Sequence, residues 1–175
     1  AACAATPLGH LASITDAAEN AFVLGLAGMD FWIGLRDRAT VSQTVNADDC
    51  TNNVWLDSNG GTYTGTNGPY NDFSSFGCEP WDSYDDIFSL RVATPGIWVF
   101  STANSSYNTL LGLYNRAGGG GWTGCVGSEI ACNDDRTGSN NKSLIIRDLA
   151  AGDFVIVVDC YNGVIDTFVL YVRRF

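Results

Sequence analysis

The sequence predicts a mainly β protein, an antiparallel sandwich or jelly roll preceded by a small α+β segment. After residue 45, short apolar segments recur at regular intervals, and each is bounded by Gly, Asn, Asp or Pro. That spacing is typical of the strands of a sandwich. Residues 1–45 differ in texture and contain the only good helix signal. We therefore expect two parts, 1–45 and 46–175, with one dominant core.

The N-terminal part is expected to form one helix and one strand. Asp16 is suited to cap the helix, Glu19 follows three residues later as in a capping box, and the apolar run ends at Gly28. A short aromatic strand is expected next, over residues 31–35.

Nine strands are expected in the second part. They lie at residues 54–56, 62–65, 87–92, 97–102, 110–114, 129–132, 143–149, 154–159 and 167–172. The run 154–158 is almost wholly apolar, which indicates a strand buried on both faces. Asn-Gly dipeptides within 58–61 and 161–163 predict turns that join antiparallel strands.

Charge and hydropathy exclude two classes of partner. The formal charge is −10, with only nine Lys plus Arg, so nucleic acid and anionic lipid are repelled at long range. No apolar run is long enough to span a membrane. We interpret the first residues, which lack a basic and an apolar leader region, as the start of a processed secreted protein.

Six cysteines and a single His favour disulfides over a metal site, and disulfides place the protein outside the cell. The cysteines alone permit many pairings. Because each closes a Gly-containing loop at modest entropic cost, we expect the local pairs Cys50–Cys78 and Cys125–Cys132. Cys3 and Cys160 are then partners by elimination.

A calcium site is the main candidate among the polar residues. Asn133, Asp134 and Asp135, joined by Asp159, offer the mixed oxygen ligands that calcium takes. The alternative is an Asx-turn with solvated carboxylates.

Five tryptophans raise the question of sugar stacking. Trp32, Trp55 and Trp98 lie in strand-like runs and are interpreted as core. Trp81 and Trp122 lie in Gly-, Pro- and Asp-containing loops and are the candidates for ligand binding.

Catalysis is not expected. His10 is the only imidazole, no Ser lies in a G-x-S-x-G motif, and nothing nominates an acid–base pair. We therefore expect a protein that is not an enzyme.

Several motifs follow one another in a recognisable order after residue 48. They include Asp49-Cys50, Asn71-Asp72-Phe73, Gly77-Cys78, Asp85-Asp86-Ile87-Phe88, Asn133-Asp134-Asp135 and Asp159-Cys160-Tyr161-Asn162-Gly163. In this order they resemble the bacterial pre-peptidase C-terminal (PPC) domain family over about residues 48–175. The resemblance implies a β-sandwich that accompanies secreted enzymes or surface proteins and contributes binding or attachment rather than chemistry.

A second resemblance covers about residues 8–37. The segments Leu8-Gly9-His10-Leu11 and Trp32-Ile33-Gly34-Leu35 are similar to the first half of the C-type lectin-like fold. The calcium and sugar loop of that fold is not matched, because Glu79-Pro80-Trp81-Asp82 has Trp in its decisive position. Lectin-type sugar binding through that loop is therefore not expected.

These observations favour a secreted, non-enzymatic protein that contacts a glycan, a matrix polymer or a cell surface. One alternative is a structural subunit that assembles with itself into a filament or surface layer through residues 1–45. A further alternative is an accessory domain of a secreted protease.

Overall fold

The computed structural model describes residues 42–45, 50–51, 53–68, 76–78, 84–119, 124–135 and 141–175. The chain divides into two compact units, Ala1–Arg38 and Ala39–Phe175, and every described residue belongs to the second. The helix and strand expected within residues 1–45 lie outside the described residues, apart from 42–45. The division into 1–45 and 46–175 stays a prediction.

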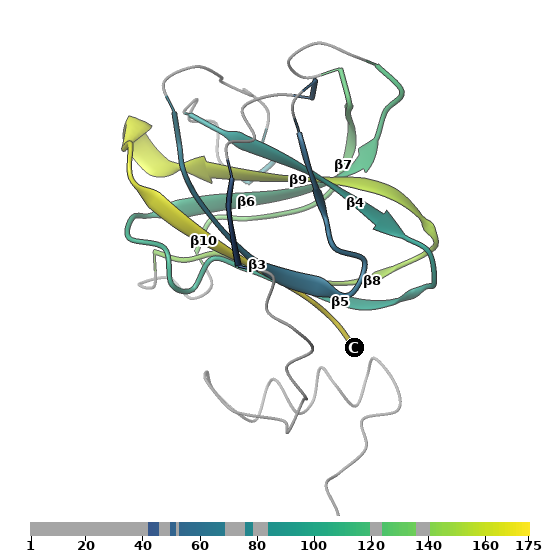
Figure 1. Ribbon diagram of the computed structural model, residues 1–175. Coiled ribbons are helices and arrows are strands. Elements are labelled where there is room, and N and C mark those ends of the chain that lie inside the picture. Colours follow the sequence, from purple (N-terminus) through teal and green to yellow (C-terminus); the bar gives the residue numbers. More distant parts are fainter. Residues whose placement is uncertain are drawn as a thin grey trace, which may run out of the picture. The chain divides into compact units, whose positions relative to one another are not determined.

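The described residues form two five-stranded sheets, which confirms the mainly β sandwich (Figure 1). Sheet A has the order β1 (Ser42–Val45), β3 (Gly60–Thr66), β10 (Thr167–Arg174), β5 (Gly96–Ser101) and β8 (Leu144–Leu149). Sheet B has the order β2 (Val54–Leu56), β4 (Asp86–Val92), β9 (Gly152–Cys160), β6 (Thr109–Arg116) and β7 (Val126–Asn133). A single-turn 3₁₀ helix, η2 (Tyr161–Gly163), follows β9.

All nine expected strands are present, because their apolar periodicity is local information. The sequence missed β1, which pairs in parallel with β3. A second parallel pair joins β2 to β4, and the remaining pairs are antiparallel. None of the described helices is long and apolar enough to cross a membrane.

Both expected hairpins are wrong, although turns do form there. β2 and β3 belong to different sheets, as do β9 and β10, so each turn carries the chain across the sandwich. At the first turn the Gly60 amide donates to the Asp57 carbonyl at 2.9 Å. Gly60 has φ +90°, and a Cβ there would lie 2.3 Å from the Val172 carbonyl oxygen. The Asn-Gly signal thus specifies a tight turn but not the sheet that receives the next strand.

The main core lies between the two sheets. Its aromatic centre includes Phe88 of β4, Phe168 of β10 and Trp98 of β5, each at most 1 % exposed. The rings of Phe88 and Phe168 meet edge to face with centroids 5.9 Å apart.

The outer face of sheet B carries a second apolar cluster, in which Ile87, Val155, Val157 and Leu110 are almost fully buried. Phe76 packs in the same cluster from outside the strands. Strand β9 is therefore buried on both faces, as its apolar run predicts.

Two disulfides, Cys50–Cys125 and Cys78–Cys132, join residues before β2 and after β3 to the residue that precedes β7 and to β7 itself. The expected local pairs are therefore wrong. Cys125 immediately precedes β7 and Cys132 lies near its end, so about 23 Å of extended chain separates them. A disulfide needs Cα atoms within about 7 Å of each other. Cys160 is buried on β9, whereas Cys3 lies outside the described residues, so Cys3–Cys160 stays a prediction.

Candidate functional site

An exposed tryptophan lies on the outer face of sheet B. Trp55 is 46 % exposed, so its interpretation as a core residue is wrong. Trp98 is 1 % exposed, which confirms that it is a core residue. Trp55 belongs to β2, an edge strand of three residues. Because side chains alternate along a strand, the buried Leu56 points into the sandwich and Trp55 points away from it.

Two arginines lie against the indole ring of Trp55. The Cζ atom of Arg91 is 5.3 Å from the ring centroid and that of Arg116 is 4.9 Å from it. A guanidinium over the face of an indole ring is attracted by the electron density of that face. We call Trp55, Arg91, Arg116, Asp153 and Ser89 the Trp55 patch.

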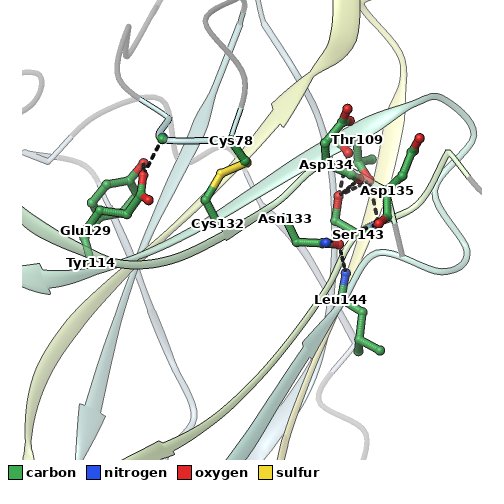
Figure 2. Close-up of a disulfide and its surroundings, with 11 residues drawn as sticks. Cys78, Thr109, Tyr114, Glu129, Cys132, Asn133, Asp134, Asp135, Ser143 and Leu144 are labelled. Atoms are coloured by element: carbon green, nitrogen blue, oxygen red, sulfur yellow. Dashed lines mark hydrogen bonds between the residues drawn. A yellow bond between two sulfur atoms is a disulfide. The ribbon is translucent and has the colours of Figure 1, made fainter. Parts of the chain in front are cut away.

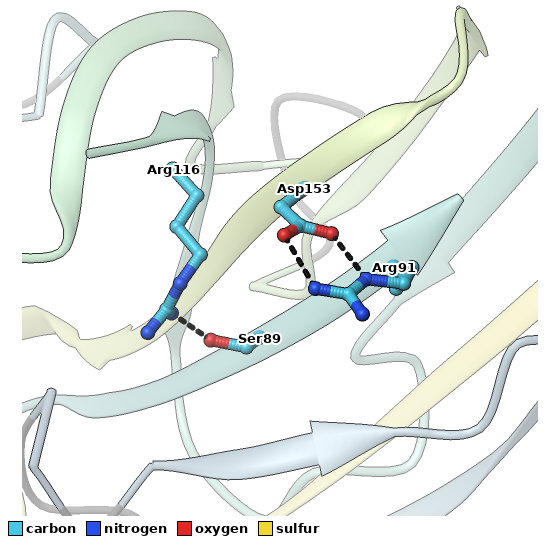
Figure 3. A network of polar contacts seen from close by, with 4 residues as sticks. All are labelled: Ser89, Arg91, Arg116 and Asp153. Carbon is cyan, nitrogen blue, oxygen red and sulfur yellow. Dashed lines mark hydrogen bonds and ion pairs between the residues drawn. The ribbon is translucent and has the colours of Figure 1, made fainter. Parts of the chain in front are cut away.

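Arg91 is fixed by an ion pair with Asp153 across two neighbouring strands (Figure 3). The two residues are Cα partners in the β4–β9 ladder, and the contact is bidentate, with Nε–Oδ1 2.8 Å and Nη2–Oδ2 2.9 Å. The hydrogen bond from Arg91 lowers the pKa of Asp153, and the same bond raises the pKa of Arg91. Both groups are therefore ionised at neutral pH.

Arg116 reaches from β6 to β4, as Figure 3 shows. Its Nη1 donates to the Oγ of Ser89, a residue that is fully buried. Asn53 donates to the same hydroxyl through Nδ2. Ser89 thus anchors a guanidinium whose own strand lies on the far side of β9.

The patch has a local charge of opposite sign to the chain. Two guanidinium groups and one carboxylate leave one positive charge, whereas the whole protein carries −10. Within the described residues, Arg116 has no carboxylate at ion-pair distance. Fixed N–H donors beside an exposed aromatic ring suit the binding of a polar ligand and supply no acid–base pair for catalysis.

The structure brings together three of the four expected calcium ligands, at the end of β7 (Figure 2). The carboxamide of Asn133, however, is already engaged on both sides. Its Oδ1 accepts from the Leu144 amide at 2.8 Å and its Nδ2 donates to the Asp135 carbonyl at 3.2 Å. The Asp134 carbonyl accepts from the Ser143 hydroxyl at 2.6 Å. These bonds are those of a loop that connects β7 to β8.

The fourth expected ligand, Asp159, lies on β9, and β6 separates that strand from β7. Its Oδ1 accepts from the Cys160 amide at 2.5 Å. Among the described residues, no group of three or more His, Cys, Asp or Glu is arranged to hold a metal ion. Calcium at these residues therefore stays a prediction.

The other sequence candidates, Trp81 and Trp122, lie outside the described residues, and so do Trp32, which is interpreted as core, and His10. The Trp55 patch was missed because a short apolar run does not show which face is covered. One signal was present: Arg91 lies between the apolar residues Leu90 and Val92, and an arginine is almost never fully buried unless it is paired.

Comparisons with known proteins give one family match. The model of the Lectin C-type domain family matches residues 1–110, well beyond the residues 8–37 that resemble that fold, and reaches β6. None of the curated proteins matches the chain in sequence.

Two solved structures are similar at low identity. One is the pre-peptidase C-terminal domain of a collagenase from Bacillus anthracis, 13 % identical, covering 79 % of this chain and 100 % of that chain with a TM-score of 0.42. The other is PliG from Aeromonas hydrophila, a periplasmic inhibitor of g-type lysozyme. It is 14 % identical, covering 77 % and 98 % of the two chains with a TM-score of 0.37.

Proposed function

Because the chain belongs to the C-type lectin domain family, we propose that it is a secreted, non-catalytic protein that binds an extracellular glycan through the Trp55 patch. The observation that carries the proposal is the half-exposed indole of Trp55 with the guanidinium groups of Arg91 and Arg116 fixed beside it. An aromatic ring offers apolar area to the C–H groups of a sugar, and neighbouring charged groups bond its hydroxyls.

The two disulfides support the extracellular part of the proposal, since such bonds persist in oxidising compartments. The patch also requires no metal. It lies on β2, β4, β6 and β9, and the sequence does not match the calcium and sugar loop of lectins.

Titration calorimetry with a panel of tetrasaccharides tests the proposal. The panel consists of cellotetraose, chitotetraose, maltotetraose and tetragalacturonate. We expect binding of at least one member, and loss of that binding in Trp55→Ala by at least tenfold, because stacking on an aromatic ring contributes on the order of 1–2 kcal/mol. Trp55→Phe keeps an aromatic face and should retain part of the affinity.

Phe175→Ala is the matched control, because Phe175 is another exposed aromatic residue, 42 % exposed, outside the patch. It should bind like the native chain. The proposal fails if no member of the panel binds, or if Trp55→Ala binds as tightly as Phe175→Ala.

A further inference from the structure

Resting on the proposed function, we infer that the Trp55 patch selects an acidic glycan, with Arg116 binding an oxyanion of the sugar. Basic residues are few in this chain. Of nine Lys plus Arg in the chain, two converge on one tryptophan ring. Placing two cations together is unfavourable unless an anion accompanies them. Asp153 forms its ion pair with Arg91, and the charge of Arg116 lowers the pKa of the same carboxyl without an ion pair of its own.

The two guanidinium groups differ in what they have left to donate. Arg91 uses Nε and Nη2 on Asp153. Arg116 uses Nη1 on the neutral hydroxyl of Ser89. Its Nε and Nη2 have no hydrogen-bond partner among the described residues, and Arg116 is only partly buried. A guanidinium edge with two parallel N–H groups matches the two oxygens of a carboxylate or sulfate.

The surrounding contacts hold that edge in place before a ligand arrives. Ser89 fixes one end of the Arg116 guanidinium, and the indole of Trp55 lies 4.9 Å from its Cζ. A donor that is already ordered loses less conformational entropy on binding than a free side chain.

The charge of the whole chain sets the size of ligand that fits. A long polyanion is repelled by the net charge of −10. A short acidic segment is not, because repulsion from charges beyond about 10 Å is largely screened at an ionic strength of about 0.1 M, whereas contact with Arg116 persists. The expected ligand is therefore a short acidic oligosaccharide or a chain of low charge density, of which one acidic residue contacts Arg116.

The test compares tetragalacturonate with its fully methyl-esterified form, which has the same sugar ring and no charge. We expect the acid to bind at least tenfold more tightly, because only the acid can place a carboxylate in a charge-assisted bidentate contact with Arg116. Arg116→Gln should lower the affinity for the acid about tenfold and leave the ester unchanged. A sulfated galactan tetrasaccharide then reports whether the oxyanion is carboxylate or sulfate.

Asp153→Asn should raise the affinity for the acid, whereas Arg116→Gln lowers it. It releases Arg91 and raises the local charge by one, so the acid should bind severalfold more tightly while the ester does not. Arg147→Gln, on β8 of sheet A, is the matched control for loss of one positive charge and should bind like the native chain. Thermal melts of all variants check that they fold.

Failure of this inference differs from failure of the proposed function. If the ester and neutral tetrasaccharides bind as tightly as the acid, with binding still lost in Trp55→Ala, the glycan site stands and its selectivity for acids is refuted. The same holds if Arg116→Gln and Arg147→Gln have equal effects. If Trp55→Ala affects none of the ligands, the glycan site itself fails.

Discussion

The Cys50–Cys125 disulfide should contribute a large part of the free energy of unfolding, and the effect of replacing it follows from the length of the loop it closes. The bond closes a loop with a sequence separation of 75, and the second disulfide, Cys78–Cys132, closes one of 54. In the chain-entropy relation these loops correspond to about 4.5 and about 4.2 kcal/mol at 25 °C. Both are upper values, because engineered removals often cost less than the relation gives.

Cys50→Ala/Cys125→Ala should therefore lower the free energy of unfolding by about 2–5 kcal/mol. Both sulfurs lie in the outer apolar cluster of sheet B, so alanine leaves small cavities without adding a buried polar group. Denaturation by guanidinium, monitored by circular dichroism, measures the change.

A crossed double variant separates the observed pairing from the local one. Cys50→Ala/Cys78→Ala removes half of each observed disulfide, and the remaining Cys125 and Cys132 are held too far apart along β7 to join. It should be destabilised far more than Cys50→Ala/Cys125→Ala, and a marginally stable domain would not survive it. If the crossed variant is instead the more stable of the two, the pairing described here is refuted.

Four further predictions concern other parts of the chain. Gly60→Ala should lower the free energy of unfolding by about 2 kcal/mol or more, because φ is +90° and the new Cβ meets the Val172 carbonyl. Gly118→Ala is the control: a Cβ there has nothing within 4 Å, so thermal denaturation of this variant should be nearly the same as that of the native chain. The pKa of Asp153 is lowered in the folded chain, so its ionised carboxylate stabilises the folded state slightly. This stabilisation is fully present above the unfolded pKa of about 4 and is lost as pH falls through the lower pKa of the folded state. The melting temperatures of the native chain and Asp153→Asn should therefore converge in acid, and a gap that widens there contradicts the ion pair. Excess chelator should lower the melting temperature if the acidic loop after β7 holds calcium, and an unchanged melt supports the Asx-turn. Light scattering on the intact chain and on one that starts at residue 46 tests self-association, since two monomers over a wide concentration range would exclude the filament alternative.

The sequence predicts well what is decided locally. Every expected strand exists, and the doubly buried β9 follows from the apolar run between Phe154 and Val158. The turn at Asn59-Gly60 is also local, because its backbone angle of φ +90° is one that Gly adopts readily. What the turn does not encode is the partner of the next strand. β3 pairs with β10, more than a hundred residues later in the chain.

Disulfide pairing failed for the same reason. Loop-closure entropy favours the nearest cysteines, but a strand keeps its ends apart. Once residues 126–133 are extended, the cysteine before the strand and the one near its end must find partners elsewhere. The two partners lie far from β7 in the sequence, Cys50 before β2 and Cys78 between β3 and β4, and their proximity to β7 exists only in the folded sheet order.

The Trp55 patch begins where the outer apolar cluster of sheet B ends. On three neighbouring strands some of the outward positions are apolar and buried, among them Ile87 on β4, Val157 on β9 and Leu110 on β6. Further along the same strands they become Arg91, Asp153 and Arg116, in one row across the sheet. A change from apolar to charged residues at one level of three strands is what an edge between covered and open surface requires, because charges this large are not buried without full pairing. Trp55 lies beside that row on the edge strand, so its ring can contact both arginines and still face water. The outer apolar cluster of sheet B thus limits the site on one side, and the row of charges supplies its ligand-binding groups.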